Sequence, residues 1–245
     1  MSPIAISLLV FVCVFGGALM GIALRSVLPE HHLSGETKDV VKGSIALVGT
    51  MSALVLGLLV ASAKGTYDTQ KDELTSLSAN VGMLDRLLRH YGPEADGARV
   101  LLKEAVAETL AHISEGVGGA TTAQGQALYD AVLGLSPKND LQKSLQSQAQ
   151  SVMQSIGQTR SLMLAQKGST LSATLLGVVV FWLAVNFVSF GLFAKPNVTA
   201  TAALLVAALS VAGAIFLILE MDRPYSGLIH ISDAPLREAL AQMGH

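Results

Sequence analysis

The chain has 245 residues, of which 51% are hydrophobic and only 14% are charged, and its formal net charge is −2. Ordinary soluble domains carry about 25% charged residues, so this composition argues against that class and favours a membrane protein. No basic excess is present, and we expect no nucleic-acid partner. The one cysteine, Cys13, lies inside an apolar segment, and a single cysteine excludes an intramolecular disulfide.

Four apolar segments contain no Asp, Glu, Lys or Arg. They are residues 3–24, 43–63, 171–194 and 198–219. At a rise of 1.5 Å per residue, about 20 residues cross a hydrocarbon core of about 30 Å. Each segment therefore predicts a transmembrane helix in a lipid bilayer. The alternative, burial of all four in a soluble core, would require an unusually apolar domain.

The distribution of positive charge predicts the orientation in the membrane. Four crossings place both termini and the middle segment on one side. Near the membrane, that side carries Lys64, Lys71, Arg160, Lys167, Arg223 and Arg237. The other side carries the smaller set of Arg25, Lys38, Lys42 and Lys195. By the positive-inside rule, we expect a multi-pass protein of the cell inner membrane with a cytoplasmic middle segment and cytoplasmic termini.

The middle segment begins with a coiled-coil-like pattern. Its apolar residues alternate at spacings of three and four, and they are Leu74, Leu77, Val81, Leu84, Leu88 and Tyr91. We call this set the seam. No proline lies between residues 43 and 91, and Gly92-Pro93 supplies a stop. One helix is therefore predicted over residues 43–91, leaving the membrane without a break.

The rest of the middle segment also has helical spacing. Helices are predicted over residues 95–115, 122–133 and 139–167, and the last is expected to run without a break into the third apolar segment. Together these helices predict a bundle. At the carboxyl end, Asp233-Ala234-Pro235 predicts the start of a short helix, either on the membrane surface or against the bundle.

These patterns predict an all-α membrane protein with two transmembrane hairpins. The first hairpin is expected over residues 1–63, the cytoplasmic bundle over 64–170, the second hairpin over 171–220, and a tail with a short amphipathic helix over 221–245. The bundle is expected to be continuous with the second and third membrane helices.

Small residues lie on one stripe of the second apolar segment. The stripe comprises Ala46, Thr50, Ala53, Gly57 and Ala61, and it ends at Lys64. Helices in lipid associate through small residues, so the stripe predicts either a surface that packs against another helix or the lining of a narrow pore. Further small residues occur on the first and fourth segments, and we expect a homo-oligomer. The alternative is that one four-helix unit covers all these faces.

The charged residues at the predicted membrane edges allow two interpretations each, one functional and one structural. His31 and His32 stand beside Glu30 and suggest a metal or proton site, or else a solvated loop, since neighbouring histidines do not share one helix face. Asp222 and Arg223 suggest gate charges, or else a structural ion pair. We predict no metal site and no cofactor. Phosphate-loop, zinc and nucleophile-elbow motifs are lacking, so we expect no enzyme.

Several motifs resemble one family. They are residues 28–34 (Leu-Pro-Glu-His-His-Leu-Ser), residues 53–64 followed by Tyr67-Asp68-Thr69-Gln70, and residues 222–229 (Asp-Arg-Pro-Tyr-Ser-Gly-Leu-Ile) with Ile231-Ser232. Over nearly its whole length the chain resembles the bestrophin-like domain family of bacterial and plant membrane proteins. That name reflects a distant similarity to bestrophins, which are pentameric anion channels. The resemblance implies a channel for inorganic ions, with anions as one class that it would carry.

The functional hypothesis is a homo-oligomeric ion channel of the bacterial inner membrane. Its pore would be lined by Thr50, Ala53, Gly57 and Ala61, with Lys64 at the cytoplasmic mouth. The alternative is a non-conducting structural or signalling membrane protein that recruits partners through its cytoplasmic helices. The seam motivates this alternative, because it needs another helix to cover it, although the return helix of the same chain would also serve.

Overall fold

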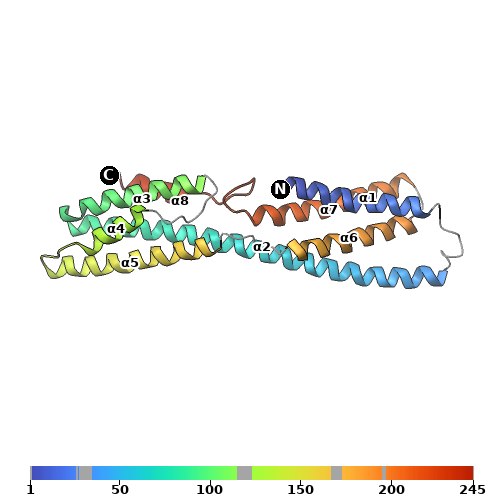
Figure 1. Ribbon diagram of the computed structural model, residues 1–245, viewed down its shortest axis with the longest axis horizontal. Helices are drawn as coiled ribbons and strands as arrows, with labels where there is room; N and C mark the ends of the chain where they lie inside the picture. Colours follow the sequence, from blue (N-terminus) through green and yellow to red (C-terminus); the bar gives the residue numbers. More distant parts are fainter. Residues whose placement is uncertain are drawn as a thin grey trace. The chain divides into compact units, whose positions relative to one another are not determined.

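The computed structural model describes residues 2–25, 27, 35–114, 123–166, 173–194 and 197–244, and these residues form helices and connecting turns without a strand (Figure 1). In chain order the helices are α1 (Pro3–Arg25), α2 (Gly35–Tyr91), the 3-10 turn η2 (Pro93–Ala95), α3 (Asp96–Ser114), α4 (Ala123–Leu133), α5 (Asp140–Ala165), α6 (Ala173–Phe193), α7 (Val198–Met221) and α8 (Ala234–Gln242). The predicted all-helical class is confirmed.

Four helices in the described part of the chain are long and apolar enough to cross a membrane. They are α1, α6, α7 and the apolar half of α2, and they coincide with the four apolar segments of the sequence. The chain divides into two compact units. Unit 1 comprises Met1–Thr66 with Thr170–Asp222, and unit 2 comprises Tyr67–Ser169 with Arg223–His245. The four-part division predicted from the sequence, which refers to a membrane, stays a prediction.

Helix α2 is a single helix of 57 residues. It continues from apolar into polar sequence as predicted, but it begins at Gly35, eight residues before the expected start at Gly43. Hydropathy marks where a helix becomes apolar, whereas its backbone hydrogen bonds extend through the polar residues before that point. The helix ends where expected, because Gly92 adopts a φ of 117° and Pro93 follows.

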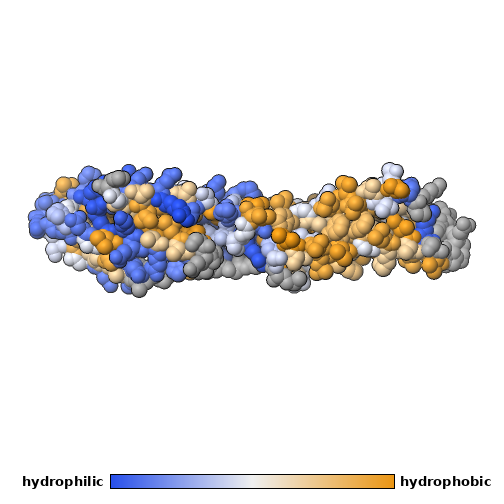
Figure 2. Space-filling view, turned by 90° about the horizontal axis from the view of Figure 1, so that it is seen from above, coloured by the Kyte–Doolittle hydropathy of each residue, from blue (hydrophilic) through white to orange (hydrophobic). Residues whose placement is uncertain are grey.

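Unit 1 is held together mainly by α1, which packs against both α6 and α7. The core between these helices contains Val14, Phe187 and Ile215, and α2 contributes Leu59 and Ala63 to a smaller cluster. The outer surface of unit 1 is mostly hydrophobic in Figure 2. Each helix exposes large apolar side chains, for example Leu8, Leu54, Phe181 and Leu209. Such a surface suits lipid rather than water.

Helices α1 and α6 approach each other through glycine. A Cβ atom on Gly21 would overlap the carbonyl oxygen of Val188, and one on Gly191 would overlap that of Ala18. A Cβ on Gly17 would lie 3.2 Å from the carbonyl oxygen of Ala184. The two backbones are therefore in direct contact, as small residues permit in membrane helices.

Unit 2 buries the seam in its own core. All six seam residues are buried, together with residues of α3, α4, α5 and α8 such as Leu102, Leu128, Ile156 and Leu236. The surface of this unit is mostly hydrophilic in Figure 2. Helix α8 packs on α3 and buries Leu236 and Ala239, so the carboxyl-terminal helix lies against the bundle.

The prediction that the return helix runs without a break into the third apolar segment is wrong. Helix α5 starts at the cap residue Asn139, whose Oδ1 accepts a hydrogen bond from the backbone of Gln142 at 2.8 Å, and it ends at Ala165. Gln166 leaves the helical region with φ −86° and ψ 3°, and its side chain donates to Glu73 Oε1 at 2.8 Å. Gly168 and Ser169 follow and are weaker helix formers than alanine.

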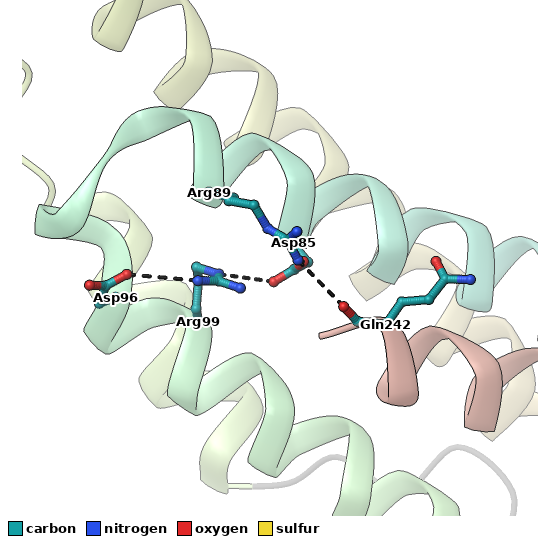
Figure 3. Close-up of polar contacts among 5 residues, drawn as sticks. All are labelled: Asp85, Arg89, Asp96, Arg99 and Gln242. Carbon is teal, nitrogen blue, oxygen red and sulfur yellow. Dashed lines mark hydrogen bonds and ion pairs between the residues drawn. The ribbon is translucent and has the colours of Figure 1, made fainter. Parts of the chain in front are cut away.

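A buried carboxylate and its two arginine partners join α2, α3 and the end of α8 in unit 2 (Figure 3). Asp85 is 5% exposed. Its Oδ2 accepts from Arg89 at 2.8 Å, and its Oδ1 accepts from Nε of Arg99 at 3.0 Å. Arg89 also donates to the backbone carbonyl of Gln242 at 3.4 Å. Because both carboxylate oxygens have cationic donors, burial of this charge is compensated.

Gly21→Val is expected to disrupt the α1–α6 contact, because the new side chain must displace backbone atoms of α6. Overpacking of this kind typically costs about 1–3 kcal/mol. The readout is the thermal unfolding midpoint of the full chain in detergent. Gly16→Val is the matched control, since Gly16 is exposed on the same helix and a Cβ there meets no atom within 4 Å. Equal midpoints for the two variants would contradict the close crossing.

Asp85→Asn is expected to destabilise unit 2 by roughly 1–3 kcal/mol, because Arg89 and Arg99 lose a charged acceptor. Denaturant unfolding of the full chain, followed by circular dichroism, measures the change. In the control Asp96→Asn, the replaced side chain is 67% exposed and lies 3.8 Å from Arg99, so a change below about 0.5 kcal/mol is expected. A stability unaffected by Asp85→Asn would show that the network contributes nothing.

Candidate functional site

The small-residue stripe of α2 lies on the outer surface of unit 1. Thr50, Ala53, Gly57, Ala61 and Lys64 are all exposed, as is Ala46 at the start of the stripe. A Cβ placed on Gly57 meets no atom within 4 Å. The face that α2 buries is a different one and carries Ser52, Leu59 and Ala63. The structure therefore brings the predicted pore residues onto one open face that the described helices of unit 1 do not cover.

The polar groups in the apolar helices hydrogen-bond mainly to their own backbone. Thr50 donates its hydroxyl to the carbonyl of Ala46 at 2.9 Å, and the buried Ser52 donates to Val48 at 2.7 Å. With its proton used in this way, the Thr50 oxygen presents only acceptor lone pairs outward. Lys64 is then the residue of the stripe that carries a positive charge.

Asn186, a polar residue inside the third apolar segment, is buried on α6 and faces α2. Its Nδ2 donates to the carbonyl of Trp182 at 2.9 Å. Its Oδ1 lies 3.4 Å from the position of a Cβ on Gly49, and it has no hydrogen-bond partner in the described part of the chain. Asn186 thus fills the space opposite a glycine of α2.

The charged edge residues are only partly described. His31 and His32 lie outside the described residues. Asp222 is half-buried at the end of α7, where its backbone N–H donates to Ile218 at 3.1 Å, and Arg223 is exposed, with its carbonyl accepting from Ser226 at 3.1 Å. Their roles as gate charges or as a structural ion pair stay predictions. The described residues contain no group of three or more His, Cys, Asp or Glu placed to hold a metal ion.

A cluster of oxygen atoms in unit 2 was not predicted. Glu73 on α2, Gln166 after α5 and Tyr225 after α7 each have a buried oxygen without a hydrogen-bond partner in the described structure. Burial raises the pKa of Glu73, while the hydrogen bond from Gln166 has a smaller, opposing effect. Burial, with a smaller contribution from the Glu73 charge, raises the pKa of Tyr225 to about 12. Tyr225 belongs to the Asp-Arg-Pro-Tyr motif, and this motif is the sequence feature that could have pointed to the cluster.

Comparison with known proteins identifies one family. The model of the bestrophin-like domain matches residues 12–236. No curated protein and no solved structure matches the chain. The matched range contains the stripe on α2, the seam and the Asp-Arg-Pro-Tyr motif, so the resemblance seen in the sequence is confirmed. With most of its length matched, the chain belongs to the bestrophin-like domain family.

Proposed function

We propose that the protein is a homo-oligomeric ion channel in which α2 lines the pore. The observation that carries the proposal is the exposed stripe of Thr50, Ala53, Gly57 and Ala61, which ends at Lys64. Membership of the bestrophin-like family supports a relationship to ion channels, and the four apolar helices with their hydrophobic surface support a membrane protein.

The proposed topology has two transmembrane hairpins, α1 with the apolar half of α2, and α6 with α7. Unit 2 and both termini lie in the cytoplasm of a bacterial cell with the chain in its inner membrane. The hydrophilic surface of unit 2 supports a position in water, and the excess of Lys and Arg beside it supports the cytoplasmic side.

Assembly would place the stripes of several copies around a common axis. Alanine and glycine leave space between neighbouring helices, and the missing side chain of Gly57 leaves room for an ion midway along the stripe. Large apolar residues such as Leu54 and Leu58 on the adjoining faces of α2 would remain against lipid or a neighbouring copy.

Lys64 would set the preference for anions. Because the Thr50 hydroxyl is engaged with Ala46, the stripe offers an anion few donors apart from the Lys64 ammonium at one end. A positive charge at a pore mouth raises the local concentration of anions and lowers that of cations.

We also propose that the protein catalyses no reaction and needs no cofactor or metal.

The alternative, a non-conducting protein that recruits partners, receives less support. Its motivation was that the seam needs a covering helix. In unit 2 the seam is buried together with residues of α3, α5 and α8, so it is not available to another protein. Co-purification of a stoichiometric partner, together with an absence of ion flux in liposomes, would favour this alternative over the channel.

Gly57→Leu is expected to reduce ion flux at least about tenfold in proteoliposomes, because four new carbon atoms project from the stripe at its open glycine. Gly177→Leu is the matched control, since Gly177 is exposed on α6 and a Cβ there also meets no atom within 4 Å. Crosslinking before reconstitution verifies that both variants keep the oligomer of the wild type. Unaltered flux through an intact Gly57→Leu oligomer would overturn the pore assignment.

Lys64→Glu is expected to move the reversal potential in a salt gradient toward cation preference, because the charge at the pore mouth changes sign. The shift should be largest at low ionic strength, where screening is weak. Lys103→Glu, on an exposed position of α3, makes the same charge change elsewhere and should leave the reversal potential unchanged. If Lys64→Glu and Lys103→Glu give the same reversal potential, Lys64 does not face the conduction path.

A further inference from the structure

Unit 2 contains a cavity of about 250 Å³ that the proposed pore does not use. Each of the five helices α2, α3, α4, α5 and α8 contributes a large apolar residue to its wall, namely Leu77, Leu102, Leu128, Ile156 and Leu236. The cavity therefore lies among the residues that form the core of the unit.

The cavity is partly open to solvent and extends between the helices of the core. Cores are close-packed, and voids larger than a water molecule are few, because they lower stability. An apolar cavity of about 150 Å³ stays free of water and admits benzene. The cavity in unit 2 is larger and partly open to solvent, and most of its wall is apolar, so an apolar molecule inside it would gain contacts that water would not supply.

One part of the wall is polar and carries a cation. Arg160 on α5 is the charged residue among the described residues that line the cavity, and Tyr129 and Ser161 also contribute there. Burial lowers the pKa of Arg160, while the nearby Glu108 carboxylate acts in the opposite direction. The guanidinium is thus partly withdrawn from water, where a hydrogen bond to an anion is stronger than on an open surface.

We propose that this cavity binds a small amphiphile that has one carboxylate and an apolar body the size of a short acyl chain, such as a medium-chain fatty acid. The apolar body would lie against the five helices, and the carboxylate would bind Arg160. A guanidinium has five N–H donors in a planar fork, so it can serve Glu108 and a ligand carboxylate together. The exposed residues Gln126 and Gly157 in the lining give the ligand a route from solvent.

The first experiment measures binding of radiolabelled octanoate to the full chain in nanodiscs, with empty nanodiscs subtracted to remove partitioning into lipid. Saturable binding at about one molecule per chain is expected. Octanol has the same apolar body without the charge, and it should compete at least about tenfold more weakly. Octanoate binding equal to that of empty nanodiscs would overturn the proposal, and equal competition by octanol would overturn the role of the carboxylate.

The second experiment fills the cavity. Ala105 lines it, whereas Ala98 lies two turns earlier on α3, is equally buried and does not line it. Ala105→Leu should abolish octanoate binding and keep or raise the thermal midpoint, because the new side chain occupies empty space. Ala98→Leu should lower the midpoint by overpacking. If Ala105→Leu leaves octanoate binding intact, the cavity is not the binding site, and if it lowers the midpoint as much as Ala98→Leu, there is no empty space beside Ala105 for a ligand to occupy.

The third experiment removes the cation. Arg160→Gln should weaken octanoate binding about tenfold or more and leave octanol binding nearly unchanged. Arg86→Gln replaces an exposed arginine of α2 outside the cavity. It should change neither the octanoate affinity nor the octanol affinity. Octanoate affinity that is the same in both variants would exclude Arg160 as the carboxylate partner. Should Arg160→Gln fail to fold, the cavity-filling pair decides the proposal by itself.

Discussion

The fold depends on one uninterrupted set of backbone hydrogen bonds, those of α2. A helix satisfies its backbone N–H and C=O groups within itself, so it can pass from apolar to polar sequence without exposing an unpaired group. Over 57 residues α2 supplies buried side chains to both units, with Leu59 and Ala63 in unit 1 and the seam in unit 2. An interruption between Gly43 and Tyr91 would separate the two sets of contacts that this helix joins in the chain.

The two units use different physical means to hold helices together. In unit 1, where the outer surface is apolar, α1 and α6 approach through Gly21 and Gly191 until their backbones touch. Lipid gives apolar side chains little reason to associate, so close packing has to supply the attraction. In unit 2, where the surface is hydrophilic, leucine-rich packing excludes water. There the Asp85 carboxylate of α2 binds Arg99 of α3, and Arg89 of α2 donates to Gln242 at the end of α8. Close backbone packing suits the apolar surface of unit 1, which favours lipid. Burial of apolar side chains suits the hydrophilic surface of unit 2, which favours water.

The proposed channel follows from what unit 1 leaves uncovered. Ser52 and Asn186 are turned into the unit, whereas Thr50 and Gly57 remain on the open face of α2. That face has room but few hydrogen-bond donors, which places the expected charge selectivity on Lys64. The cavity beside Arg160 is a separate feature of unit 2, and it also combines an apolar space with one cation. A failure of either proposal would leave the other unaffected.

The sequence by itself determined where most of the helical segments lie. Apolar runs located α1, α6 and α7, the alternation of three and four residues identified the buried seam, and Gly92-Pro93 marked the end of α2. These features depend on residues close together in the chain. Only the tertiary structure decided that the small-residue stripe is exposed, that α5 stops at Ala165, that Asp85 meets Arg99 and that Arg160 borders a cavity. Periodicity defines the faces of a helix, but which face is covered depends on packing between residues that are distant in the sequence.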